Sequence, residues 1–152
     1  MNYKEALTYA MNLCSTQERC RSEVAGKLAS RGLSGTEIEA VLNALVRENF
    51  IDESRYAGSF VRDKIRFNKW GKVKIRHMLR QKNLPESIVA DALDAVDEEW
   101  YGSILKEELL KKHRSIKGGK APDLRGKLYR FALQRGFESG RIYQILDEIL
   151  NS

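Results

Sequence analysis

The chain repeats one apolar pattern three times, and this repetition constrains its fold more than any other feature. The first copy runs from Val24 to Leu45 with apolar residues three and four apart. A shift of 51 residues carries the pattern onto the stretch from Ile75 to Val96. A further shift of 53 carries it onto the stretch from Leu128 to Ile149. Tandem units of this length are typical of helical arrays, in which each unit buries apolar surface against its neighbours.

Seven positions of the repeated pattern are apolar in all three copies, and we expect them to form the core. They are Val24, Leu28, Leu33, Ile38, Val41, Leu42 and Leu45 in the first copy, Ile75, Leu79, Leu84, Val89, Ala92, Leu93 and Val96 in the second, and Leu128, Ala132, Phe137, Ile142, Ile145, Leu146 and Ile149 in the third.

The spacing of three and four predicts amphipathic helices, and no alternating run is long enough for a strand. Gly32, Asn83 and Gly136 occupy the same position in each copy, where a helix ending in a left-handed residue favours Gly or Asn. We expect the passage from Val89 to Leu110 to join the second and third units as nearly continuous helix. Three helices are predicted in each unit, over 3–14, 22–31, 35–48, 53–67, 72–82, 85–97, 100–113, 122–135 and 140–150.

The predicted fold class is all-α, with three tandem three-helix repeats over 1–50, 51–99 and 100–152. One unit closes only a small core. Burying about ten Leu-sized side chains, each contributing roughly 1.5–3 kcal/mol, barely offsets the entropy of ordering its backbone. We therefore expect neighbouring repeats to stack into an elongated, curved, solenoid-like body.

The composition argues against a membrane or secreted protein. The chain has 152 residues, 42% apolar and 32% charged, and no apolar run near the ~20 residues of a membrane helix. Its start lacks the order of a signal peptide, and Cys14 and Cys20 have no disulfide-scaffold pattern. We expect a reduced cytoplasmic protein that is a monomer and does not bind membranes.

The charge is unevenly distributed along the chain. Residues 55–82 hold ten Lys or Arg and one acid, Asp63, which gives a local charge of +9 in a chain of net charge +6. Residues 83–100 are acidic without any Lys or Arg, and residues 111–141 are basic again. Such a polarised surface is complementary to a long polyanion or to an acidic face of a protein.

The first basic block contains the main site candidate. Lys72, Arg76 and Arg80 are four residues apart and therefore share one helix face, with Arg66 and Lys69 just before them. Cations at this spacing can follow the phosphates of a strand and release counterions on binding. A solvated basic face is commoner in sequences at large, but the local charge of +9 and the second basic block favour binding here. The candidate contacts for nucleic acid or a nucleoprotein filament are Arg66, Lys69, Trp70, Lys72, Lys74, Arg76, Arg80, Lys111, Lys112, Arg114, Lys117 and Lys120.

Aromatic residues alternate with these cations, as in proteins that stack single-stranded bases. The aromatics are Tyr56, Phe60, Phe67 and Trp70. Tyr56 and Phe60 share the spacing of the core, so we expect them to be buried. Trp70, beside Gly71 in a predicted loop, is more open to contact with a partner.

No residue pattern predicts catalysis or a cofactor. Asp52 and Glu53 precede a helix, where carboxylates bind free N–H groups, so capping is favoured over a paired-carboxylate site. The cysteines and histidines lack zinc spacing, and no nucleophile, Walker or dinucleotide motif occurs. We expect a protein that is not an enzyme, with no catalytic residues, metal or cofactor.

Several segments resemble the RecX family. Residues 22–33 resemble the first half of its signature, and residues 51–57, IDESRYA, resemble its leucine-acid-acid-aromatic-alanine segment. Residues 70–75, WGKVKI, with Leu79 and 82–84, resemble the glycine-to-basic-helix segment that follows. The resemblance covers most of 5–97 and is looser over the third unit.

This resemblance implies a small bacterial regulator of the RecA recombinase, built from three tandem three-helix repeats. Such proteins bind in the groove of the filament that RecA forms on single-stranded DNA, and they restrain recombination and co-protease activity. The implied partners are thus the RecA filament and, more weakly, single-stranded DNA.

Two other interpretations of the residues stay open. The chain could be a helix-turn-helix protein that recognises a specific duplex sequence, since a three-helix unit with a Gly turn has that local form. It could also be a helical scaffold that binds an acidic protein and no nucleic acid.

Overall fold

The computed structural model describes residues 1–116 and 123–151, and these residues fold into helices and their connections. The elements are α1 (Tyr3–Thr16), α2 (Arg21–Ser30), α3 (Gly35–Arg47), α4 (Glu53–Asp63), the π-helical η1 (Lys64–Asn68), α5 (Lys72–Gln81), α6 (Glu86–Asp94), α7 (Glu98–Ser115), α8 (Leu124–Gln134) and α9 (Ser139–Leu150).

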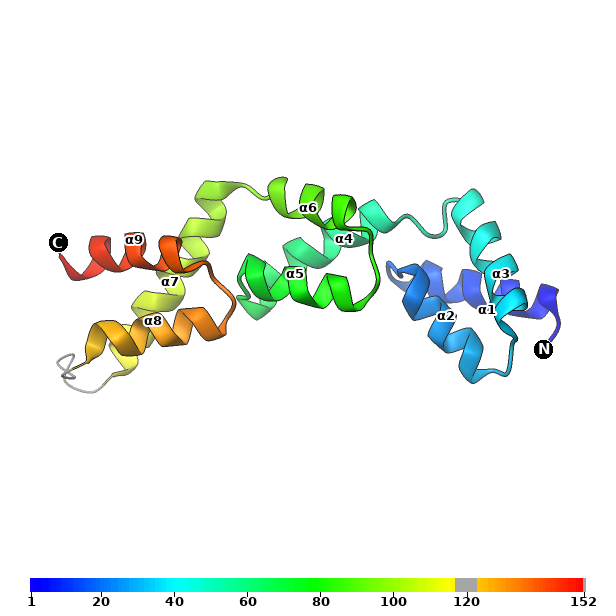
Figure 1. Cartoon of the computed structure of the whole chain (residues 1–152), viewed down its shortest axis with the longest axis horizontal. Helices are drawn as coiled ribbons and strands as arrows, with labels where there is room; N and C mark the ends of the chain where they lie inside the picture. The colour runs from blue at the N-terminus through cyan, green and yellow to red at the C-terminus, as the bar shows by residue number, and fades with distance from the viewer. Residues whose placement is uncertain (117–122, 152) are drawn as a thin grey trace.

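The helices form three groups that follow one another in a row. Figure 1 shows α1, α2 and α3 at one end of the molecule, α4, α5 and α6 in the middle, and α7, α8 and α9 at the other end. The two termini consequently lie at opposite ends of an elongated body. The prediction of an all-α fold with three tandem three-helix repeats is confirmed, and the exact repeat boundaries stay a prediction.

The repeated apolar positions build the core. All of them are buried except Ile38, Ala92 and Ile149, which are partly buried and pack against their neighbours. The predicted helix ends are also present, because Gly32, Asn83 and Gly136 all have positive φ, at 88°, 62° and 93°. The second helix of each repeat therefore ends in the same left-handed turn, which leads into the third helix.

The core is divided unequally among the repeats. Residues from α4 to α9 form one continuous apolar cluster, whereas α1 to α3 enclose a separate, smaller one. Cys20, just before α2, is the member of the first repeat that belongs to the larger cluster. The second and third repeats thus form one packed body, to which the first repeat is attached.

Backbone hydrogen bonds fix the third repeat against the second. The N–H groups at the start of α5 have no partner within their own helix. Gly71 N donates to the carbonyl oxygen of Arg135 at 2.7 Å, and Val73 N donates to that of Gly136 at 2.9 Å. Between them, Lys72 N donates to the hydroxyl of Tyr101 at 2.9 Å. The third repeat thereby satisfies three donors of a helix in the second.

This joint requires glycine at two positions. A Cβ on Gly71 would lie 2.3 Å from the backbone of Gly136, and a Cβ on Gly136 would lie 2.3 Å from the Cβ of Lys74. Since Cβ atoms do not approach other heavy atoms so closely, these two segments of the chain can meet only because residues 71 and 136 are both glycine.

The joint between the first and second repeats is more polar. Lys82 Nζ lies 3.3 Å from a carboxylate oxygen of Glu23, and Arg55 forms an ion pair with Glu18. Arg21 N also donates to the Glu53 carboxylate at 3.4 Å. Exposed or half-exposed ion pairs of this kind contribute little to stability, so the first repeat is held less firmly than the third.

The structure corrects one expectation. The passage from Val89 to Leu110 is not a continuous helix, because α6 ends at Asp94 and α7 begins at Glu98. The Asp97 side chain accepts a hydrogen bond from Trp100 N at 2.9 Å and so starts a new helix. Within the described residues, no helix is both long and apolar enough to cross a membrane.

Candidate nucleic-acid interface

The face of α5 that carries Lys72, Arg76 and Arg80 is lined by carboxylates. Arg76 lies 2.7 Å from Glu86, and Arg80 donates two hydrogen bonds to the same carboxylate, each of 2.8 Å. Lys72 Nζ lies 2.8 Å from Glu98. The acidic block that follows the basic one in sequence therefore folds back onto it, through the first residues of α6 and α7.

These contacts change the electrostatics of the predicted row. Hydrogen bonds from Arg80, its charge and the contact with Arg76 together lower the pKa of Glu86 to about 2. The pKa of Glu98 is lowered as well, first by its hydrogen bond with Lys72. Both carboxylates are charged at neutral pH, so a phosphate must compete with them for this face.

The turn that precedes α5 carries two cations that, unlike those on α5, have no carboxylate partner in the described ranges. Arg66 and Lys69 form no ion pair with any residue in the described ranges, and Arg66 is exposed. Between them, Phe67 has 71% of its surface exposed, more than any other large apolar residue in the described ranges. We name these three residues, Arg66, Phe67 and Lys69, the basic corner.

The backbone of the basic corner departs from an α-helix. The chain winds as a π-helix over η1 and then enters the left-handed region at Lys69, with φ of 56°. Trp70 N donates to the carbonyl oxygen of Lys64 at 3.2 Å and closes this wider turn. Short π-helical turns are frequent at functional sites, where they redirect side chains out of a regular helix.

Trp70 lies beneath the corner rather than on it. Its ring is partly buried against the core, with Lys74 Nζ 4.3 Å and Lys64 Nζ 5.0 Å from the ring centroid. These cation–π contacts tie α5 to the end of α4. Contact of Trp70 with a partner stays a prediction. Tyr56 is buried and Phe60 packs against the core, as expected.

Phe67 is the residue that sequence reasoning did not single out. It follows the buried Ile65 by two residues, which places it on the opposite side of the helix. That spacing and its place among the aromatics that alternate with cations are the signals in the sequence, and they do not separate an exposed ring from one covered by another repeat.

The second basic block lies on the third repeat. Lys111 is close to Glu107 and Glu108, at 3.7 and 3.8 Å, and Lys112 Nζ lies 5.4 Å from the ring centroid of Phe131. Arg114 is exposed near the end of α7. The remaining two candidates, Lys117 and Lys120, lie outside the described residues.

The described parts of the chain hold no cluster of metal-ligating side chains. No three His, Cys, Asp or Glu side chains there are close enough to share a metal ion. Burial raises the pKa of the Cys14 and Cys20 thiols, which keeps both in the less reactive protonated form.

Three family models match the chain in tandem. They are described as the first, second and third three-helix domains of RecX, and they cover residues 6–45, 52–93 and 103–146. The chain is 35% identical over 149 residues to a regulatory protein RecX of Prosthecochloris aestuarii, covering 98% of this chain and 96% of the relative. It is 32% identical over 146 residues to that of Vibrio parahaemolyticus, covering 93% and 88%.

A solved structure shares the fold. The crystal structure of RecX from Lactobacillus salivarius superposes with a TM-score of 0.88 at 24% identity, covering 99% of this chain and 97% of the other. The agreement extends over all three repeats and therefore includes their arrangement in a row.

Proposed function

The chain belongs to the RecX family of regulatory proteins, and from this membership we propose that it binds the RecA filament on single-stranded DNA. It lies in the filament groove and restrains recombination and co-protease activity. The mechanism is non-catalytic: an elongated protein that contacts successive subunits changes how they pack or how fast they turn over ATP.

The basic corner is the observation that carries this proposal. An exposed aromatic ring between two cations without intramolecular partners in the described ranges fits a strand whose bases are accessible and whose phosphates recur. Stacking of a base on such a ring contributes roughly 1–3 kcal/mol, and the flanking cations gain affinity by releasing counterions. Duplex DNA offers phosphates but no free base to Phe67.

The length of the molecule supports contact with more than one subunit. The second and third repeats share one core, and the first repeat extends the row (Figure 1). A body of this shape can lie along a groove while the basic corner, near its middle, reaches the nucleic acid.

Inhibition of RecA-driven strand exchange tests the proposal. The variant Arg66→Glu/Lys69→Glu reverses the two cations of the corner, and we expect roughly tenfold weaker inhibition, because charge reversal at an interface disfavours binding by more than about 1.4 kcal/mol. The matched control, Lys27→Glu/Arg47→Glu, reverses two exposed cations of the first repeat and should inhibit like the wild type. Equal inhibition by all three proteins would remove the corner from the mechanism.

Titrations with RecA-coated single strands, bare single strands and duplex DNA test which of these ligands the protein prefers. We expect tight binding to RecA-coated single strands, weak and salt-sensitive binding to bare single strands, and weaker binding to duplex. Each phosphate that a corner variant no longer neutralises should reduce the slope of log affinity against log salt by about 0.7 on single strands. Preference for one duplex sequence would instead support a helix-turn-helix DNA-binding protein.

A further inference from the structure

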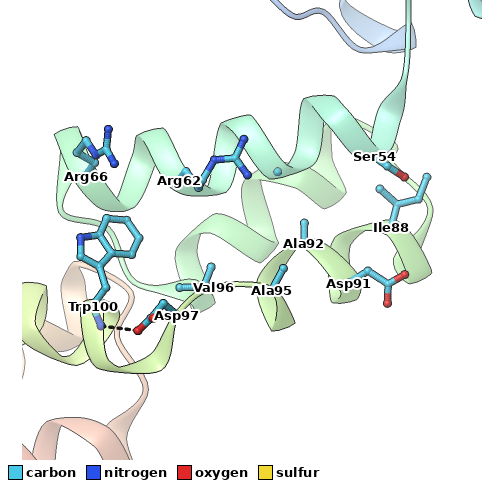
Figure 2. Close-up of a pocket in the computed structure, with 11 residues that line it drawn as sticks. Ser54, Arg62, Arg66, Ile88, Asp91, Ala92, Ala95, Val96, Asp97 and Trp100 are labelled. Carbon is cyan, nitrogen blue, oxygen red and sulfur yellow. Dashed lines mark hydrogen bonds between the residues drawn. The ribbon is translucent and has the colours of Figure 1, made fainter. Parts of the chain in front are cut away.

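A groove of about 570 Å³ lies between α4 and α6 in the middle repeat. Figure 2 shows Arg62 of α4 and Arg66 of η1 on one side, with Ala92 and Ala95 on the other. Trp100, at the start of α7, lies at the same end of the groove as Arg66. The groove shares Arg66 with the basic corner, and its other lining residues are distinct from the corner and from the row on α5.

The groove is open because the facing side chains are small. Gly58 has no side chain, and its hypothetical Cβ would meet only the guanidinium of Arg62, 3.1 Å away. Ala95 is exposed, and Ala92 is only partly buried although it belongs to the repeated apolar pattern. Apolar surface is thus available between the helices, where a larger side chain from another molecule would fit.

The charges around the groove favour an anionic occupant at one end. Arg62 and Arg66 have no carboxylate partner among the described residues. The carboxylate of Asp97 lies nearby, but it accepts the Trp100 N–H at 2.9 Å and serves the start of α7. Asp91 lies toward the opposite end, near Ile88 (Figure 2).

We infer that this groove docks an acidic segment of a protein partner that also carries one large apolar side chain. Carboxylates of the segment pair with Arg62 and Arg66, where arginine can donate two parallel hydrogen bonds. The apolar side chain lies over Ala92 and Ala95 against Trp100. The inference rests on the proposed function in that the partner is a protein filament rather than bare nucleic acid.

An apolar floor distinguishes this occupant from a nucleic acid strand. Phosphates would find two arginines, but the strand would also cover Ala92, Ala95 and the Asp91 carboxylate, which offer it neither positive charge nor hydrogen-bond donors. Peptide segments that combine an apolar anchor with charged neighbours bind grooves of this type.

Peptide binding measured by fluorescence anisotropy tests the inference on the full chain. The probe is a short labelled peptide in which aspartates flank a central phenylalanine. We expect it to bind the wild type, and to bind Arg62→Gln and Ala95→Trp roughly tenfold more weakly, the first through a lost charged hydrogen bond and the second through a filled groove. The matched control Arg47→Gln should bind like the wild type. Unchanged circular dichroism melts would show that each variant folds.

Substitutions in the peptide test whether both its carboxylates and its aromatic side chain are needed for binding. Replacing its aspartates by asparagines, or its phenylalanine by alanine, should each abolish most of the binding. Binding that is insensitive to these changes, or that Ala95→Trp leaves intact, would overturn the inference. Ala95→Trp fills the groove and leaves Arg66 in place, so a loss of affinity for a single-stranded oligonucleotide equal to its loss for the peptide would also overturn the inference. Displacement of the peptide only by a second copy of this chain would overturn it as well.

Strand-exchange assays separate this inference from the proposed function. Arg62→Gln and Ala95→Trp should inhibit RecA less than the wild type does, in parallel with their weaker peptide binding. A wild-type protein that does not inhibit at all would refute the proposed function, while the peptide titration would still decide the groove.

Discussion

At the scale of single residues, the closest backbone approach between the second and third repeats depends on Gly71. Replacing it by alanine would place a methyl group 2.3 Å from the backbone of Gly136 and Phe137. We expect Gly71→Ala to lower the free energy of unfolding by about 1–3 kcal/mol, as overpacking of a tight contact usually does. Urea denaturation of the two proteins would measure the difference.

Gly26→Ala is the matched control. Gly26 lies inside α2, and a Cβ there would meet no atom within 4 Å. Since alanine is favoured over glycine in a helix by roughly 1 kcal/mol, this variant should be more stable than the wild type. A destabilised Gly26→Ala, or a neutral Gly71→Ala, would contradict the structure.

The ionisation of Glu86 predicts a pH dependence. Its folded pKa of about 2 lies below the ordinary value of 4.5, so ionisation favours the folded state. This stabilisation is complete above about pH 4.5. It is lost as the pH falls from there toward 2. Glu86→Gln should abolish that part of the acid sensitivity, measured as melting temperature against pH.

An NMR titration of the wild type provides the direct control for Glu86. Its carboxyl resonance should titrate well below those of exposed glutamates without arginine partners. A midpoint in the ordinary range would show that Arg76 and Arg80 do not hold this carboxylate in solution.

The sequence predicted residues whose environment is set by the helical repeat, and missed those set by tertiary contacts. Leu28, Leu79 and the left-handed Asn83 follow from spacing and from backbone preference. The pairing of Arg80 with Glu86 does not, because it depends on how α6 turns back along α5. The local charge of residues 55–82 therefore overstated the free charge of that face.

At the scale of elements, the first turn of α5 is held by the third repeat through Tyr101. The Tyr101 hydroxyl accepts a hydrogen bond from Lys72 N at 2.9 Å and donates one to Glu138. Burial, and then the bond to Glu138, raises the pKa of this tyrosine, which stays neutral. We expect Tyr101→Phe to reduce the free energy of unfolding by about 1–3 kcal/mol, since a buried N–H loses its acceptor. Chemical denaturation measures this loss.

Tyr143→Phe serves as the comparison for Tyr101→Phe. Tyr143 lies on α9 with 48% of its surface exposed, so removal of its hydroxyl should change stability by less than about 0.5 kcal/mol. Equal effects of the two variants would mean that the hydroxyl of Tyr101 does not join the repeats.

A substitution at Glu86 can make the basic row on α5 available to bind phosphates. Glu86→Gln removes the charge that competes for Arg76 and Arg80, so both become available to phosphates. We expect tighter binding of single-stranded DNA at low salt and a slope against log salt that is steeper by about 0.7 for each additional phosphate bound. Unchanged affinity would show that this face does not contact nucleic acid.

At the scale of the whole molecule, the division of the core predicts two units of stability. The α4–α9 cluster is larger and continuous, and the first repeat depends on its own small cluster. Elements with less buried apolar surface open at lower free energy. The periodicity of the sequence did not reveal this division, because all three repeats carry the same pattern. The second and third repeats are joined by tertiary contacts, among them the close approach of Gly71 and Gly136 and the apolar cluster that both repeats share.

Native-state hydrogen exchange tests this division with two core variants. Leu28→Ala and Leu105→Ala each remove a fully buried side chain, at an expected cost of about 2–5 kcal/mol. Leu28→Ala should lower protection in α1 to α3 and leave the other helices unchanged. Leu105→Ala should lower protection in α4, α5 and α6 as much as in α7, α8 and α9, because these helices share one core. Loss of protection confined to the third repeat would show that the second and third repeats open independently. The hydrogen bonds at the start of α5 would then be too weak to make the two repeats unfold together.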